Sequence, residues 1–282
     1  MSDATVFRMR SVSFRYPHGE RQAVAGVDLD VTQGEMVALL GPNGSGKSTV
    51  LRLLLGALRA DAGSVALFGR DVHAWQREDI ARAVGVVTQA EEQAFPLTVR
   101  ELVSMGRYPH LGAWRREGPA DHAAIARALD RCGLTNLSHR SVLELSAGER
   151  QRARVARALA QEPRTMLLDE PSASLDIAHE MSLFELLAEL RANGVTIAIV
   201  THNINVAARY ADRLVLLDRG TVAAAGSPPA VLTREIIEHV YQWPVAIRSE
   251  DGSPQVVPRR GQMQTRATNP VHDVQPVIGR SE

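Results

Sequence analysis

Residues 41–49 read Gly-Pro-Asn-Gly-Ser-Gly-Lys-Ser-Thr, and this stretch constrains the fold more than any other part of the chain. The apolar run 36–40 comes directly before it and has the length and character of a buried parallel strand. The stretch 50–55 comes after it and predicts a helix. A strand, a glycine-rich loop and a helix in this order form the setting of a phosphate-binding loop. We therefore expect an α/β fold that binds phosphate where this helix begins.

The side chains and glycines of the loop suit it to phosphate. Gly41, Gly44 and Gly46 let successive backbone N–H groups turn inward as a nest for oxygen atoms. Lys47 is the single lysine among 32 basic residues, which indicates a need for a compact ammonium rather than a planar guanidinium. The alternative is a chance match in a glycine-containing turn. The residues of the predicted phosphate loop are Gly41, Pro42, Asn43, Gly44, Ser45, Gly46, Lys47, Ser48 and Thr49.

Length and composition narrow the class of protein. A chain of 282 residues can hold one large α/β domain with a small appendage. The formal net charge is zero, so the composition does not indicate a nucleic-acid-binding surface. The single cysteine, Cys132, excludes an internal disulfide and is typical of a reducing compartment. We see no export signal and no apolar run near the roughly 18–20 residues that span a bilayer, so any work at a membrane is expected to require partner chains.

The second half of the chain alternates strands and helices in the way that parallel βαβ units do. We expect strands at 165–169, 195–200 and 214–217. Helices are expected between them, at 177–193 and 204–211. These strands are predicted to join the strand before the phosphate loop in one mostly parallel sheet.

Between about 90 and 160 the pattern becomes helical and is broken by glycine and proline. Capping boxes at Thr98 and at Ser146 predict that helices begin there. Residues 108–114 carry aromatic residues and glycine and predict a loop. We interpret the whole stretch as a helical subdomain inserted into the α/β core.

The chain becomes polar from residue 249 and contains several prolines. This composition predicts a disordered tail at 259–282, preceded by one short strand at 255–257. The folded domain is therefore expected to span residues 1–258.

Polar side chains follow the predicted strands at the edge where ligands sit in open α/β sheets. Asp169 and Glu170 end one buried strand. In phosphate-loop enzymes such an aspartate holds Mg²⁺ together with the loop serine, here Ser48, and a neighbouring glutamate can activate water. The alternative is a surface Asp-Glu pair at a strand end. Gln89 and His202 end two further strands and could reach the metal and the γ-phosphate, or could be structural.

Several motifs together carry a family resemblance. They are the loop 41–49, Gln89, Leu145-Ser146-Ala147-Gly148-Glu149, Met166-Leu167-Leu168-Asp169-Glu170, Ser174-Leu175-Asp176 and His202. In this order they resemble the ATP-binding subunit of an ABC transporter, over residues 5–258. The resemblance implies a phosphate-loop NTPase core with a mostly parallel sheet, an antiparallel β subdomain and the inserted helical subdomain.

The resemblance also implies the chemistry of the site. ATP is the implied substrate and Mg²⁺ the implied cofactor, with Lys47 and the loop amides on the β- and γ-phosphates. Tyr16 stands where the family stacks an aromatic ring on adenine; the alternative is a structural tyrosine at a strand end. The implied metal ligands are Ser48, Gln89 and Asp169, and the implied catalytic residues are Glu170, His202 and Gln89.

ATPases of this kind resemble one another in working as head-to-tail pairs. Ser146 and Gly148 of one copy would contact the γ-phosphate held by the other copy, and Asp176 would cross the interface. The commoner signature has two glycines and a glutamine, where this chain has Ala147 and Glu149. Glu149 preserves the capping box, whereas Ala147 restricts the backbone near phosphate, so any effect is expected on turnover rather than on binding.

Within the family the chain is most similar to the ATPases of importers for iron–siderophore complexes, haem and cobalamin. The stretches that carry this resemblance are 98–103, 106–110, 175–179 and 206–212. It implies ATP-driven import through two membrane-spanning permease subunits and, indirectly, a periplasmic or surface substrate-binding protein. The implied location is peripheral, at the cytoplasmic face of the inner (plasma) membrane, with no nucleic-acid partner. The choice among the three chelates stays open.

The inserted subdomain is where the family receives a short helix of the membrane subunit. Tyr108, His110 and Trp114 are predicted either to line that groove or to pack inside the subdomain.

Other kinds of ABC ATPase remain as alternatives. A DNA-repair ATPase carries a long coiled coil between loop and signature, whereas roughly 100 residues without a heptad run separate them here. A ribosome-associated ATPase has two cassettes in one chain, and this chain has one. An ATPase of iron–sulfur assembly, and a protein that binds ATP but hardly hydrolyses it, stay open.

Overall fold

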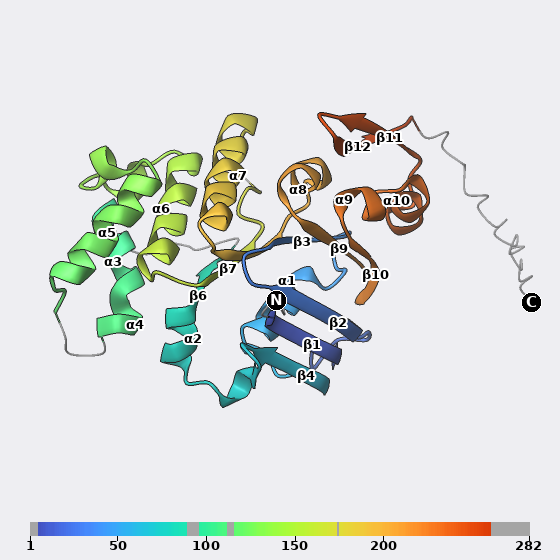
Figure 1. Cartoon of the computed structure of the whole chain (residues 1–282), viewed down its shortest axis with the longest axis horizontal. Helices are drawn as coiled ribbons and strands as arrows, with labels where there is room; N and C mark the ends of the chain where they lie inside the picture. The colour runs from blue at the N-terminus through green and yellow to red at the C-terminus, as the bar shows by residue number, and fades with distance from the viewer. Residues whose placement is uncertain (1–4, 89–95, 112–115, 174, 261–282) are drawn as a thin grey trace, which may run out of the picture.

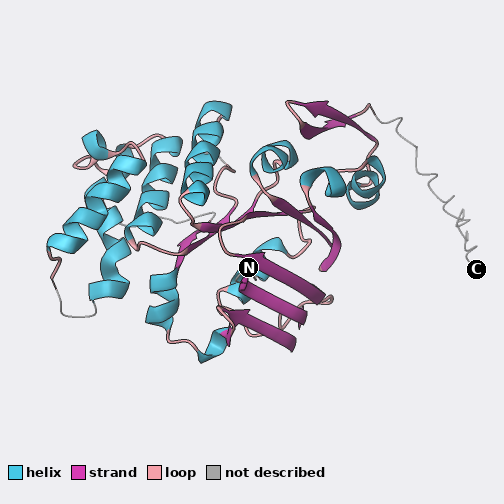
Figure 2. Ribbon diagram, viewed as in Figure 1, coloured by secondary structure: helices cyan, strands magenta, loops and turns pink. Residues whose placement is uncertain are grey.

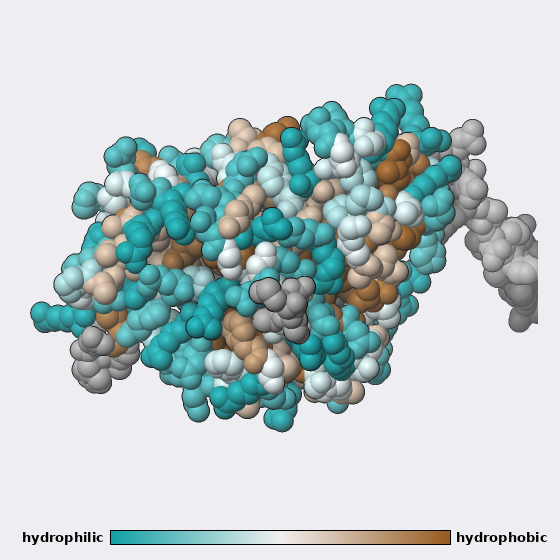
Figure 3. All heavy atoms as spheres, viewed as in Figure 1, coloured by the Kyte–Doolittle hydropathy of each residue, from teal (hydrophilic) through white to brown (hydrophobic). Residues whose placement is uncertain are grey.

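The structure is a computed structural model that describes residues 5–88, 96–111, 116–173 and 175–260. Figures 1 and 2 show a central sheet with a second, antiparallel sheet on one side and a group of helices at one end. Hydrophilic side chains are spread over the face seen in Figure 3, and apolar ones appear there in small groups. None of the helices in the described ranges combines the length and the hydropathy that crossing a bilayer requires.

The central sheet has the strand order β10-β9-β3-β8-β7-β6. All its neighbouring pairs are parallel except the β9–β10 hairpin. Its strands are β3 (Met36–Leu40), β6 (Val84–Val87), β7 (Thr165–Asp169), β8 (Thr196–Val200), β9 (Arg213–Asp218) and β10 (Thr221–Gly226). The helices that connect them are α1 (Lys47–Leu54), α2 (Arg77–Ala83), α7 (Ile177–Ala192) and α8 (Ile204–Tyr210). The predicted parallel sheet and its helices are thus confirmed, with bounds within a few residues.

The central strand β3 separates two hydrophobic cores, because alternate side chains of a strand point to opposite faces. Met36, Ala38 and Leu40 belong to the core shared with α6 (Ala147–Ala160), α7 and α8. Val37 and Leu39 belong to the core shared with α1 and the antiparallel sheet. A strand buried on both faces explains why the sequence before the phosphate loop is apolar throughout.

The antiparallel sheet has the order β2-β1-β4-β5. Its strands are β1 (Thr5–Phe14), β2 (Val24–Thr32), β4 (Ala62–Leu67) and β5 (Arg70–Asp71). Helix α1 packs between this sheet and the central one, since Val50, Leu53 and Leu54 are buried among residues of both. This arrangement fixes the start of α1, and with it the phosphate loop, between two sheets.

The helical group consists mainly of α3 (Val99–Ser104), α4 (Tyr108–Leu111), α5 (Pro119–Arg131) and α6 (Ala147–Ala160). The capping boxes predicted at Thr98 and Ser146 are both present. The predicted loop at 108–114 is wrong in its first part, because Tyr108–Leu111 is the short helix α4. Pro109 permits it, since proline is tolerated in the first turn of a helix.

The C-terminal part contains more structure than the sequence predicted. Helices α9 (Pro228–Val231) and α10 (Arg234–Tyr241) lead into the hairpin β11 (Val245–Glu250) and β12 (Ser253–Pro258). Asn205 of α8 holds β12 by two hydrogen bonds, because its Oδ1 accepts from Val256 N at 2.8 Å and its Nδ2 donates to Val256 O at 3.3 Å. After β12, the backbone N–H of Arg259 donates to Pro244 O at 3.0 Å. Residues 261–282 lie outside the described residues.

Candidate functional site

The phosphate loop turns tightly at the C-terminal end of β3. Gly41 has φ 143° and a β-carbon there would lie 2.2 Å from the carbonyl oxygen of Leu217. Gly46 has φ 102° and a β-carbon there would lie 2.3 Å from the carbonyl oxygen of Ala23. Both distances are below any normal contact, so a side chain at either position would displace the loop from its neighbours. The loop geometry therefore requires glycine at these two positions.

Lys47 lies across the mouth of the loop and is 6% exposed. Its Nζ donates hydrogen bonds to Gly41 O at 2.9 Å and to Pro42 O at 3.0 Å. Burial lowers the pKa of Lys47, and the nearby charges of Glu170 and Asp169 oppose this effect. The ammonium group is thus held at the loop by carbonyl oxygens and carboxylates, which suits it to meet an incoming phosphate.

Ser48 and Asp169 meet beside Lys47. Ser48 Oγ donates to Asp169 Oδ1 at 3.0 Å, which joins the first turn of α1 to the end of β7. Burial raises the pKa of Asp169, the hydrogen bond from Ser48 lowers it and the charge of Glu170 raises it. A hydroxyl and a half-buried carboxylate at the edge of a phosphate site are the oxygen donors that Mg²⁺ takes when substrate phosphates supply the rest of its shell. The donor set therefore fits Mg²⁺.

Glu170 and His202 complete this group at the ends of two neighbouring strands. Asp169 pairs with Val200 across β7 and β8, and the backbone N–H of Glu170 donates to Val200 O at 3.0 Å. Glu170 has φ 47°, an uncommon conformation for a residue with a side chain. Its Oε2 lies 4.0 Å from His202 Nδ1. The predicted residue Gln89 lies outside the described residues.

Tyr16 lies on the other side of the start of α1. Its hydroxyl lies 3.3 Å from Thr49 Oγ1 and 3.5 Å from a guanidinium nitrogen of Arg52. Its ring and that of Phe14 form a T-shaped pair, with the ring centroids 4.9 Å apart. The side chain is partly exposed, so it can offer a ring face to a base next to the phosphate loop. The sequence did not predict a role for Arg52. The signal that could have indicated one is its position one helical turn after Ser48.

Ser146, Gly148 and Asp176 form a second group. Ser146 Oγ accepts from Glu149 N at 3.2 Å, and Asp176 Oδ1 accepts from His179 N at 2.9 Å, so each residue caps a helix. In the part of the chain that the structure describes, no hydrogen bond or ion pair connects them to the phosphate loop. The sequence predicts no role for His179, although it stands three residues after the cap, the usual position for a contact with a capping side chain.

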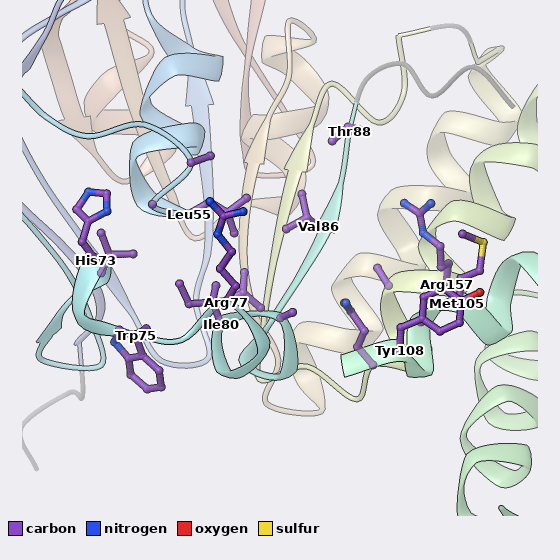
Figure 4. A pocket seen from close by; sticks show the side chains of 18 residues that line it. Leu55, His73, Trp75, Arg77, Ile80, Val86, Thr88, Met105, Tyr108 and Arg157 are labelled. Carbon is purple, nitrogen blue, oxygen red and sulfur yellow. The ribbon is translucent and has the colours of Figure 1, made fainter. Parts of the chain in front are cut away.

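A cavity of about 790 Å³ separates the helical group from the α/β part. Figure 4 shows His73, Trp75 and Ile80 on one side of it and Tyr108, Met105 and Arg157 on the other. Tyr108 is 62% exposed and lines this cavity; its contact with a helix of a membrane subunit stays a prediction. His110 instead follows the alternative prediction of packing inside the helical group.

Two residues next to Tyr108 contact the C-terminal end of α6. His110 Nε2 lies 2.9 Å from Gln161 O. Arg107 is buried and its Nη1 donates to Ala160 O at 2.6 Å. Both contacts use carbonyl groups at the C-terminal end of α6, which have no partner inside the helix. The wall that carries Tyr108 is thus fixed to α6. The third predicted groove residue, Trp114, lies outside the described residues.

Comparison with known proteins gives relatives that match along most of the chain. The ferric enterobactin transport ATP-binding protein FepC of Escherichia coli (strain K12) is 39% identical over 257 residues, covering 90% of this chain and 95% of that protein. The hemin import ATP-binding protein HmuV of Nocardia farcinica (strain IFM 10152) is 44% identical over 229 residues, covering 80% and 78%. Among solved structures, a chain of an ABC transporter described as of metal-chelate type, in an inward-facing conformation, superimposes with a TM-score of 0.78. It is 28% identical and covers 90% of this chain and 96% of that one.

A bacterial ABC transporter cassette solved as a dimer also matches, with a TM-score of 0.70 and 29% identity, covering 78% of this chain and 98% of that one. The family model of the ABC transporter matches residues 24–173, which include the phosphate loop, the helix cap at Ser146 and the carboxylates that follow β7. The chain therefore belongs to the ABC transporter family.

Proposed function

We propose that this protein is the ATP-hydrolysing subunit of an importer for a metal chelate. The observation that carries the ATPase assignment is the meeting of Ser48 and Asp169 at 3.0 Å next to Lys47, with Glu170 adjoining. The relatives carry the import assignment, because they include proteins named for ferric enterobactin, hemin, petrobactin and iron(3+)-hydroxamate. Of the three predicted classes, these names favour a ferric siderophore or haem over cobalamin.

In the proposed site the nucleotide lies along the start of α1. Tyr16 stacks on the adenine, while the loop amides of residues 41–49 surround the β- and γ-phosphates. Lys47 leaves its two carbonyl partners and binds between these phosphates. Ser48 and Asp169 hold Mg²⁺, with Gln89 as a further proposed ligand; the ion neutralises phosphate charge when it is bound.

Hydrolysis needs a base and a group that orients the γ-phosphate. Glu170 follows the metal-binding carboxylate and lies at the edge of the sheet where the γ-phosphate is expected, so it orients the attacking water and takes its proton. His202 Nδ1 lies 4.0 Å from Glu170, which leaves its Nε2 to donate a hydrogen bond to the γ-phosphate. Glu170 and His202 thus act on the same face of the triphosphate.

A second copy of the chain completes the site in a head-to-tail dimer. Ser146 and Gly148 of that copy contact the γ-phosphate, and Asp176 crosses the interface. Helix α6 begins at Ser146, so its N-terminal end favours an anion. ATP stabilises the dimer because both copies contact it, and hydrolysis with phosphate release removes that stabilisation.

The cavity beside Tyr108 is the proposed docking site for a permease segment. It lies between the α/β part and the helical group, so a segment bound there is in contact with both. The chain is proposed to work with two permease subunits, peripherally at the cytoplasmic face of the membrane, and to receive the chelate indirectly from a substrate-binding protein.

Uptake measurements test the proposal. The protein is co-expressed and purified with its candidate permease subunits, and uptake of ferric siderophores, haem and cobalamin is compared in proteoliposomes. We expect ATP-dependent uptake of one ferric siderophore or of haem, and none with Glu170→Gln. ATP hydrolysis without uptake of any of these chelates would contradict the import assignment.

A further inference from the structure

One histidine joins the N-terminal ends of α6 and α7. Asp176 caps α7, and its Oδ1 accepts from His179 N at 2.9 Å and from His179 Nδ1 at 2.8 Å. Because a carboxylate only accepts, the Nδ1 of His179 carries a hydrogen. These contacts hold the pKa of Asp176 below its usual range, with the backbone N–H of His179 as the largest cause. The cap therefore fixes the ring of His179 as well as the helix end.

The ring of His179 occupies the space that a side chain at Gly148 would need. A β-carbon on Gly148 would lie 2.1 Å from His179 Cδ2, 2.6 Å from Cγ and 2.9 Å from Nε2. These atoms belong to a ring held by Asp176, so they cannot move away as the end of a flexible side chain would. Gly148 does not have a positive φ, so the backbone conformation alone does not demand glycine there. Glycine is required at this position because the ring of His179 occupies the space of a side chain.

The two helix starts that His179 joins are exposed to solvent. Ile177, next to Asp176, is 80% exposed, which is unusual for an aliphatic side chain at a helix start. Ser146 at the start of α6 and Asp176 at the start of α7 are exposed as well. The packing of His179 against Gly148 joins these two helix starts. Nothing in the phosphate loop takes part in this contact.

We propose that His179 is a positioning residue: it sets the distance between the first turn of α6 and the cap of α7, and so shapes the surface that one copy presents to ATP bound by the other. The proposal rests on the head-to-tail dimer of the proposed function. On this proposal, glycine is required at position 148 by packing within its own subunit, in addition to any contact with the γ-phosphate of the other copy.

The test uses the full chain carrying Glu170→Gln, so that bound ATP persists. Dimerisation is measured by analytical ultracentrifugation in MgATP, and nucleotide binding by a fluorescent ATP analogue at protein concentrations where the chain is monomeric. His179→Ala should weaken dimerisation about tenfold or more, because the cap of α7 and the first turn of α6 are no longer held in the geometry that the other copy binds. Nucleotide binding by the monomer should change less than about twofold, because the phosphate loop is untouched.

Two further variants distinguish the effect of the hydrogen bond to Asp176 from the effect of ring packing against Gly148. His179→Phe keeps a ring against Gly148 but has no donor for Asp176, and His179→Gln keeps an amide donor; each should restore part of the loss. His239→Ala, which removes an exposed histidine of α10, is the matched control and should dimerise like the parent.

A double variant tests the steric argument. Gly148→Ala should lower the urea midpoint of the monomer, because its methyl group collides with the ring, and it should lower that midpoint less when His179→Ala has removed the ring. If Gly148→Ala unfolds, the single His179 variants still decide the question.

Three results would overturn the inference. His179→Ala dimerising as well as its parent is the first, and a loss of monomer stability in Gly148→Ala that removal of the ring does not relieve is the second. The third is an equal loss of monomeric nucleotide binding, which would show a general structural defect. A parent that stays monomeric in MgATP would overturn the proposed function and this inference together.

Discussion

Replacing Arg107 with alanine tests whether a buried ion pair fixes the wall of the cavity. The side chain of Arg107 is 6% exposed, and its Nε donates to Asp121 Oδ1 at 2.9 Å. Its Nη1 donates to Ala160 O at 2.6 Å and to Glu162 Oε2 at 3.0 Å. The variant removes all three contacts and leaves a largely buried carboxylate and a helix-terminal carbonyl without this donor.

The magnitude follows from how buried each contact is. Breaking a buried ion pair by removing one member costs about 3–5 kcal/mol. Asp121 also accepts from Gly118 N at 3.0 Å, which keeps part of its stabilisation, so we expect a loss near the lower end, about 3 kcal/mol. The matched control is Arg127→Ala. Arg127 forms an ion pair with Glu162 at 2.8 Å, and the side chains of the two residues are 59% and 50% exposed. An exposed pair of this kind contributes about 0–1 kcal/mol.

The assay is equilibrium unfolding in urea, analysed by linear extrapolation. Arg107→Ala should lower the urea midpoint with an unchanged slope, and its thermal midpoint should fall by about 6–12 °C. Arg127→Ala should change both values by a small fraction of that. Equal losses of unfolding free energy in the two variants would refute the argument that burial decides the strength of this network.

Three further predictions concern the site. Ser146→Ala removes the cap of α6 and should cost about 1 kcal/mol of unfolding free energy; an unchanged urea midpoint would show that another group caps the helix. Lys47→Ala should abolish binding of a fluorescent ATP analogue, because the chain has no other lysine to meet the phosphates, and unchanged affinity would remove the lysine from the proposed site. Burial raises the pKa of the Cys132 thiol to about 12, so at pH 8 almost none is thiolate and a disulfide reagent should label the native protein only as it unfolds; rapid labelling of native protein would show that Cys132 is accessible.

The sequence predicted the parts of the fold that local chemistry determines. The phosphate loop between β3 and α1 was predictable because its glycines and its lysine meet a specific steric demand. The capping boxes at Thr98 and Ser146 were predictable because the cap and its glutamate lie three residues apart in the chain. Asp169 and Glu170 were found because polar residues directly after an apolar strand are conspicuous.

The features that the sequence did not reveal depend on contacts between distant segments. The sequence predicts a short strand at 255–257, and β12 confirms it, but the pairing of β12 with β11 in a hairpin is not predicted. This hairpin forms in a stretch with prolines because β12 packs on α8 and is held by Asn205. The sequence predicts a loop where α4 forms, because Pro109 and aromatic residues are typical of loops. The attachment of α4 to α6 through Arg107 and His110 cannot be predicted from the local pattern. The contact of His179 with Gly148 likewise joins two helices that are remote in sequence.

Steady-state phosphate release by Glu170→Gln, compared with that of the unchanged protein in saturating MgATP, tests the central claim most directly. The account predicts that the variant binds ATP as tightly as the unchanged protein and releases phosphate at least about 100-fold more slowly, because the carboxylate that takes the proton from water is gone. Equal rates of phosphate release would contradict it.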